Sequence, residues 1–187
     1  MPQKDRILNI PNVLTLTRII LTPFIIFAIL ENQPVMALLL MGIAGLTDML
    51  DGAIARYFDQ RSTVGAFMDP LADKLMLIST IVTLYMINQL PLFLFLAVVF
   101  RDIIIMVGAI AYEMVTHKLE MQPSMTSKIT TALQITLVLT VLAKMAWQIP
   151  GEPFQQIAIW LTFAFTCMSG VHYMVVWMRK AVTAEAD

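Results

Sequence analysis

Six apolar runs dominate the chain, and short polar breaks separate them. Each run is long enough, at roughly 20 residues, to cross the hydrocarbon of a bilayer as a helix. The breaks are rich in Pro, Asn, Gln and Glu, which end helices or face water. The pattern predicts an all-α, polytopic membrane protein with six transmembrane helices, at about 13–30, 34–57, 66–88, 91–116, 126–147 and 153–178.

Composition agrees with a chain whose main solvent is lipid. Apolar residues make up 59% of the sequence and charged residues 13%, and the mean hydropathy is +0.79. Six spans in 187 residues leave little for a soluble domain, so we expect one membrane domain over residues 1–187. The formal charge of -1 does not indicate a nucleic-acid partner, and the lone Cys167 excludes an internal disulfide and a cysteine metal cluster.

The flanking charges predict an orientation. Residues 1–12 mix charged and apolar side chains, which suits a short amphipathic helix in the interface plane, with a frayed terminus as the alternative. Basic residues gather on one side of the six-helix arrangement, so both termini, including the tail 179–187, are expected in the cytoplasm. No transit segment precedes the first span, which favours a bacterial inner (plasma) membrane. The basic residues on that side are Lys4, Arg6, Arg56, Arg61, Lys74, Lys118, Lys128, Arg179 and Lys180.

Four carboxylates interrupt the second and third apolar runs. Asp48 and Asp51 are three residues apart, and Asp69 and Asp73 are four apart, so each pair shares one helical face. In an antiparallel hairpin about the intervening turn, Asp51 lies level with Asp69 and Asp48 with Asp73. We expect all four acids to meet in one layer towards the cytoplasmic side.

A divalent-metal site explains these acids best. A charged side chain near the middle of a bilayer costs on the order of 3 kcal/mol, and four neighbouring acids also repel one another. A divalent cation relieves both problems, and oxygen-only ligands favour Mg²⁺ or Mn²⁺, with two ions sharing bridging carboxylates. The alternative is a set of structural ion pairs with Arg56, Arg61 or Lys74, or acids at the water boundary.

The same residues carry a resemblance to a known family. They reproduce DxxDGxxAR, then eight residues, then GxxxDxxxD, which is the signature of the CDP-alcohol phosphotransferases. The stretch "NIPNVLTLTR" is also similar to the first span of that family, and the six-span layout covers nearly the whole chain. The matching positions are Asp48, Asp51, Gly52, Ala55, Arg56, Gly65, Asp69 and Asp73.

The resemblance implies transfer of a phosphatidyl group from CDP-diacylglycerol to an alcohol, with release of CMP. It implies that Asp48, Asp51 and Asp69 ligate a pair of divalent ions. Asp73 would help to hold metal and act as the catalytic base that removes the acceptor's proton. The implied CDP-binding residues are Asp48, Gly52, Ala55, Arg56 and Gly65, with Arg56 on the diphosphate. The resemblance also implies a homodimer packed through later spans, which is an expectation by analogy with the family.

Two basic residues in the later spans are candidates for binding the acceptor. Arg101 lies inside the fourth run, where a buried Arg indicates an anionic partner. A pair with Asp102 is the alternative, which we disfavour because neighbours at i and i+1 do not face each other. Lys128 opens the fifth run, and it could equally extend to the membrane interface.

The acceptor is inferred from the same spans. Enzymes that use glycerol 3-phosphate resemble one another in an Arg-Glu pair followed eight residues later by a second Arg, but here Asp102 and Ala109 stand at those positions. Arg-Asp with the following polar pattern looks more like the CMP-forming cardiolipin synthases. We therefore expect phosphatidylglycerol as acceptor, with glycerol 3-phosphate as the alternative. The following pattern consists of Pro123, Ser124, Ser127, Lys128, Thr131 and Gln134.

A membrane transporter is the alternative from another functional class, because acids within a membrane also mark ion pathways. The sequence shows no internal repeat, and the acids cluster towards one side instead of following a path across the bilayer. Both observations favour the enzyme.

Overall fold

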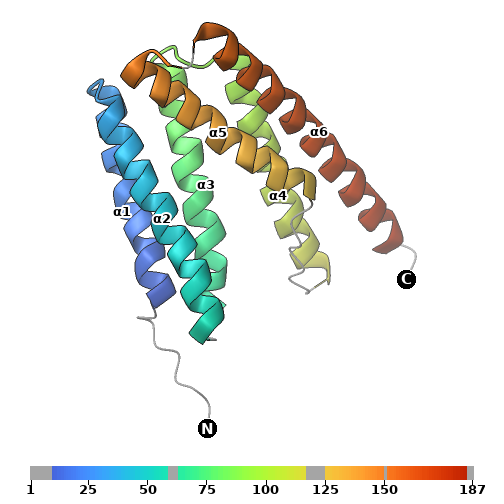
Figure 1. The fold of residues 1–187 in the computed structure, drawn as a ribbon. Coiled ribbons are helices and arrows are strands. Elements are labelled where there is room, and N and C mark those ends of the chain that lie inside the picture. The colour runs from blue at the N-terminus through green and yellow to red at the C-terminus, as the bar shows by residue number, and fades with distance from the viewer. Residues whose placement is uncertain (1–9, 59–62, 117–124, 150, 185–187) are drawn as a thin grey trace. The chain divides into compact units, whose positions relative to one another are not determined.

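The computed structural model describes the backbone of residues 10–58, 63–116, 125–149 and 151–184 (Figure 1). Within these ranges it describes the side chains of residues 16–47, 72–108, 125–149 and 151–176. The described chain consists of six helices: α1 (Ile10–Leu30), α2 (Pro34–Phe58), α3 (Thr63–Met86), α4 (Leu92–Thr116), α5 (Met125–Trp147) and α6 (Glu152–Ala184).

The all-α prediction and the six helices are confirmed, with most ends within three residues of the predicted positions. The exception is α6, which continues to Ala184 instead of ending at about residue 178. The predicted end lay before Arg179 and Lys180, where the apolar run stops. A helix satisfies its own backbone hydrogen bonds, so it can continue from an apolar into a polar environment.

Two of the described helices are long and apolar enough to cross a membrane. These are α5, over Met125–Trp147, and α6, over Glu152–Val176. Shorter apolar stretches lie at Leu16–Leu30 in α1 and at Pro34–Thr47 in α2. That the six helices cross a membrane stays a prediction. Residues 1–9 of the predicted interfacial segment lie outside the described residues, so its amphipathic helix also stays a prediction.

Three tight turns end α1, α3 and α5 in the same way. Asn32, Asn88 and Gln148 have positive φ angles of 54°, 60° and 60°, the left-handed conformation that commonly ends a helix. After α1, the amide of Asn32 donates to the carbonyl of Ile29 and that of Gln33 to the carbonyl of Ala28. This pattern is a Schellman motif. A proline follows each turn within three residues and separates the helices.

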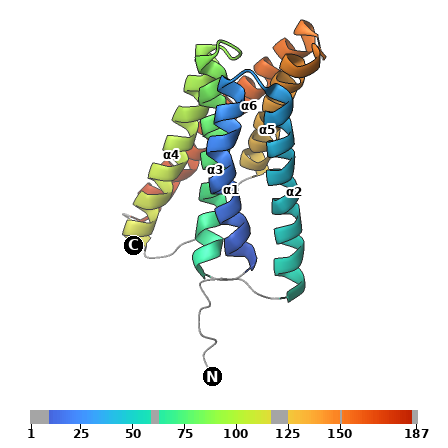
Figure 2. The same cartoon turned by 90° about the vertical axis from the view of Figure 1, so that its left-hand side faces the viewer.

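The chain divides into two compact units. The first contains residues 1–87 and 142–149, and the second contains residues 88–141 and 150–187. In the first unit α1 packs against both α2 and α3 (Figure 2). The core of this unit includes Ile25, Ile29, Ala44, Ile81 and Leu84, all of them fully buried or nearly so. Helix α1 therefore supports the two helices that carry the acidic motif.

In the second unit α4 packs against α6 through an aromatic cluster. The ring of Phe93 stacks on that of Trp160 with a centroid distance of 5.1 Å. It meets the ring of Phe163 edge to face, also at 5.1 Å. Stacked and edge-to-face arrangements are the geometries that aromatic pairs prefer.

Helices α5 and α6 are joined by reciprocal side-chain bonds. Thr130 Oγ1 donates to the carbonyl of Phe165 at 3.1 Å, and Thr162 Oγ1 donates to the carbonyl of Leu133 at 3.4 Å. Both threonines are buried. Each hydroxyl thus crosses to the backbone of the neighbouring helix, as small polar residues commonly do between membrane helices.

Candidate functional site

The backbone of α2 and α3 is helical through both halves of the acidic motif. Because α2 is continuous, Asp48 and Asp51 lie on one of its faces, and Asp69 and Asp73 likewise share a face of α3. The side chains of Asp48, Asp51 and Asp69 lie outside those that the structure describes. The meeting of the four acids in one layer therefore stays a prediction.

The predicted CDP-binding residues belong to the same two helices. Gly52, Ala55 and Arg56 are in α2 and Gly65 is in α3, at positions whose side chains are also outside the described set. Among the described side chains, no three His, Cys, Asp or Glu residues gather. Asp73 is the one predicted metal ligand whose side chain the structure describes. Whether the site suits a metal therefore depends on the types of atom that the four predicted ligands offer. Four carboxylates form an oxygen-only set, which suits Mg²⁺ or Mn²⁺.

Asp73 has a buried cationic partner from another helix. Nη1 of Arg18, in α1, donates to Oδ1 of Asp73, in α3. The side chain of Arg18 is 1% exposed, whereas that of Asp73 is 49% exposed. The carboxylate is thus held by the protein, while about half of the surface of the Asp73 side chain stays accessible to an ion or a substrate.

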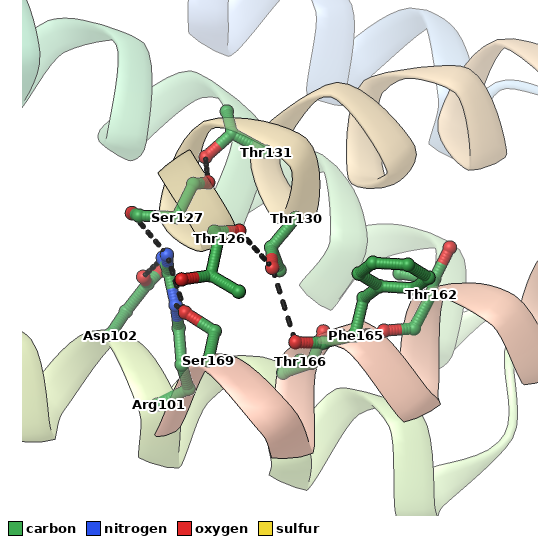
Figure 3. Close-up of polar contacts among 10 residues, drawn as sticks. All are labelled: Arg101, Asp102, Thr126, Ser127, Thr130, Thr131, Thr162, Phe165, Thr166 and Ser169. Atoms are coloured by element: carbon green, nitrogen blue, oxygen red, sulfur yellow. Dashed lines mark hydrogen bonds and ion pairs between the residues drawn. The ribbon is translucent and has the colours of Figure 1, made fainter. Parts of the chain in front are cut away.

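A second polar cluster surrounds Arg101 in the unit formed by α4, α6 and most of α5 (Figure 3). Its guanidinium group donates to side chains from all three helices. Nη1 lies 2.5 Å from Oδ1 of Asp102, and Nη2 lies 2.5 Å from Oγ of Ser127. Nε and Nη2 each lie 3.3 Å from Oγ of Ser169. Arg101, Asp102 and Ser169 are buried, so the cluster is an internal connection between the helices.

The pair between Arg101 and Asp102 corrects the prediction that these neighbours do not face each other. Their ion pair is formed, with both residues buried. Adjacent positions do diverge on a helix, but the long side chain of Arg101 can bend back towards the next residue. The positive charge of Arg101 is consequently compensated within its own helix.

Lys128 and Gln134 differ sharply in their surroundings, although both belong to the polar pattern of α5. Lys128 is exposed, next to the Ser127 hydroxyl that Arg101 holds. Gln134 is 1% exposed, and no hydrogen-bond partner for its Nε2 is found among the described residues. A buried amide donor without a partner carries a desolvation cost.

Comparison with known protein families supports the resemblance of the acidic motif. The family model of the CDP-alcohol phosphatidyltransferases matches residues 8–168 of the chain, from before α1 into α6. The chain belongs to the CDP-alcohol phosphatidyltransferase family. The family motif thus lies on α2 and α3, with the Arg18–Asp73 pair at its C-terminal end.

Curated relatives within this CDP-alcohol phosphatidyltransferase family carry two kinds of name. The cardiolipin synthase (CMP-forming) of Homo sapiens is 32% identical over 96% of this chain and 64% of its own length. That of Streptomyces coelicolor is 38% identical over 57% of this chain and 53% of its own length. The CDP-diacylglycerol--glycerol-3-phosphate 3-phosphatidyltransferase of Bacillus subtilis is 30% identical over 88% of this chain and 93% of its own length. The chain thus spans less than two thirds of these cardiolipin synthases.

Several polar residues of this family member were not predicted as functional from sequence. Arg18 is the clearest, since it is a basic residue inside an apolar run, as Arg101 is, and such a position indicates an anionic partner. Another signal was the spacing of Thr162, Thr166 and Ser169 at i, i+4 and i+7, which predicts a polar face on α6. The structure shows all three buried.

Proposed function

We propose that this protein transfers the phosphatidyl group of CDP-diacylglycerol to an alcohol and releases CMP. The observation that carries the proposal is the complete family motif on α2 and α3, in a chain matched by the family over residues 8–168. The relatives from Homo sapiens and Bacillus subtilis bear names of this reaction class.

The proposed metal ligands are Asp48, Asp51, Asp69 and Asp73, holding two Mg²⁺ or Mn²⁺ ions. The oxygen-only donors and the half-exposed carboxylate of Asp73 support this assignment. When bound, the ions would neutralise the diphosphate and stabilise the charge that develops on it as CMP leaves.

The chain's own residues bind the nucleotide and move the proton. Arg56 donates to the diphosphate, since a guanidinium group matches the geometry of phosphate oxygens. Gly52, Ala55 and Gly65 leave room for the nucleotide close to the backbone. Asp73 accepts the proton of the acceptor's hydroxyl group as this oxygen attacks the phosphorus in line with the leaving CMP. The ionised form needed for that step is the form that pairs with Arg18.

The favoured acceptor is phosphatidylglycerol, which gives cardiolipin. The cardiolipin synthases of Homo sapiens and Streptomyces coelicolor support this choice by their names. The compensated charge of Arg101 also supports it. With Arg101 paired to Asp102, Lys128 is the remaining cation among the predicted acceptor-binding residues, and one cation suits a monoanionic phosphodiester better than a doubly charged phosphate. In this proposal Arg101 fixes the start of α5 in the acceptor-binding region, and the exposed Lys128 contacts the headgroup.

Glycerol 3-phosphate is the second candidate acceptor, and one observation favours it. The Bacillus subtilis relative, which is 30% identical over 88% of this chain, has a name that specifies glycerol 3-phosphate.

The deciding experiment incubates purified protein with radiolabelled CDP-diacylglycerol, Mg²⁺ or Mn²⁺, and one acceptor at a time. We expect labelled cardiolipin with phosphatidylglycerol. Product with glycerol 3-phosphate alone would reverse the choice of acceptor. Absence of product with either acceptor, despite metal-dependent binding of CDP, would contradict the proposed transfer. A transporter would bind no CDP-lipid in a metal-dependent manner.

We also propose that the protein is an integral membrane protein whose active site faces the cytoplasm, in a bacterial inner membrane. The apolar helices α5 and α6 and the distribution of basic residues support this placement. A homodimer stays an expectation by analogy with the family.

A further inference from the structure

Arg18 is the most deeply buried charged side chain among those described, and it lies within the apolar helix α1. Its side chain is 1% exposed, and its partner Asp73 lies 55 residues further along the chain. A guanidinium group inside an apolar bundle is costly unless a carboxylate compensates it. The charge of Asp73 therefore stabilises the buried guanidinium group of Arg18.

The exposure of the pair is one-sided. Arg18 is enclosed by the protein, whereas about half of the Asp73 side chain is accessible, at 49%. In an ion pair that serves only to neutralise a buried acid, both side chains would be expected to be buried. Here the guanidinium group approaches the carboxylate from the protein side and leaves its other side accessible.

The backbone that carries Arg18 is held between the acidic helices, because α1 packs against both α2 and α3. Thr22 and Ile25 follow Arg18 at i+4 and i+7 on the same face of α1, and both are buried in the core of this unit. A bond from such a fixed position restricts the rotation of the Asp73 side chain. Bonds of this kind to a functional carboxylate orient it, and their loss typically lowers metal affinity or activity about 10- to 100-fold.

We propose that Arg18 is a positioning residue of the phosphatidyl-transfer site, which orients the carboxylate of Asp73 towards the acceptor's hydroxyl group. The inference rests on the proposed function. It adds a residue from α1 to a site that the family motif confines to α2 and α3.

The test compares Arg18→Met and Arg18→Lys with Asp73→Asn and the double variant Arg18→Met/Asp73→Asn. Thr83→Val is the matched control, because Thr83 is buried in α3 and loses one hydrogen bond, to the carbonyl of Ser79. Turnover is measured with radiolabelled CDP-diacylglycerol and the acceptor that the wild type uses. Binding of CDP in the presence of Mn²⁺ is measured by calorimetry, and the unfolding midpoint by tryptophan fluorescence.

We expect Arg18→Met to lower turnover about 10- to 100-fold while leaving the affinity for CDP unchanged. Arg18→Lys should recover part of the turnover, since its ammonium group can replace the Nη1 donor to Asp73. The double variant should be no slower than Asp73→Asn, because Arg18 acts through that carboxylate. Its unfolding midpoint should fall by less than the sum of the two single changes. Thr83→Val should match the wild type in turnover and CDP binding.

Three results would overturn the role of Arg18. They are full turnover in Arg18→Met, loss of CDP binding in parallel with turnover, and no recovery in Arg18→Lys. The second would indicate a purely structural residue. A wild-type protein that yields no product with either acceptor would instead remove the proposed function, so the two failures are distinguishable.

Discussion

Replacing Asp102 by Asn tests whether the charge of Asp102 stabilises the folded protein by compensating the buried cation of Arg101. The substitution preserves the shape of the side chain and an acceptor oxygen for Nη1, but it removes the compensating charge. Arg101 is 3% exposed, so its guanidinium group cannot be rehydrated without opening the helices. Its bonds to Ser127 and Ser169 involve neutral hydroxyl groups and do not replace the lost charge.

Removing one partner of a buried ion pair typically costs 3–5 kcal/mol, and about 3 kcal/mol is expected here because the hydrogen bond can persist. For a chain of this size each 1 kcal/mol lowers the unfolding midpoint by about 2–4 °C, so the expected decrease is about 6–12 °C. Asp102→Asn should therefore unfold well below the wild type. The double change Arg101→Met/Asp102→Leu removes both charges, and it should recover most of the loss because apolar replacements of buried pairs are often neutral.

The assay is thermal unfolding of purified protein in detergent, followed by the fluorescence of the three tryptophans. Thr136→Val is a suitable control, because Thr136 is an exposed residue of α5 whose hydroxyl bonds only within its helix. An unfolding midpoint of Asp102→Asn within about 2 °C of the wild type corresponds to less than about 1 kcal/mol. Such a result would refute the claim that Asp102 compensates the charge of Arg101. So would a double variant that unfolds below Asp102→Asn.

Three further outcomes are expected. Asp73→Asn should stay folded and bind CDP, with an unfolding midpoint below that of the wild type because Arg18 loses its compensating charge, yet lose turnover because the base is removed; near-normal turnover in the radiolabel assay would exclude Asp73 as that base. Chelation of divalent ions by EDTA should abolish turnover, and Mg²⁺ or Mn²⁺ should restore it, whereas activity that persists in EDTA would contradict the metal site. Gln134→Met should raise the free energy of unfolding by up to about 2 kcal/mol, since it removes a buried donor without a described partner; a lower unfolding midpoint in the fluorescence assay would show that the amide is satisfied in the folded protein.

Local sequence signals predicted the helices well because each signal is contained in a few neighbouring residues. The breaks around Asn32 and Asn88 combine residues that tolerate a left-handed backbone with a following proline, and both do end helices. The spacing of Asp69 and Asp73 likewise needed only a continuous helix to place them on one face, and α3 supplies it. The family motif is equally local, since its eight positions lie within two consecutive helices.

The sequence by itself determined the six helices, the acidic motif and the family, but it did not determine which face of each helix meets which neighbour. Lipid and protein core are both apolar, so hydropathy cannot separate them. In α1, Phe24 and Phe27 are 57% and 62% exposed, whereas Ile25 and Ile29 are fully buried or nearly so. Only the packing of α1 against α2 and α3 turned Arg18 towards Asp73, and only the approach of α4 to α6 placed Arg101 beside Ser169. Those pairs are 55 and 68 residues apart, and they depend on helix rotations that an apolar pattern does not encode.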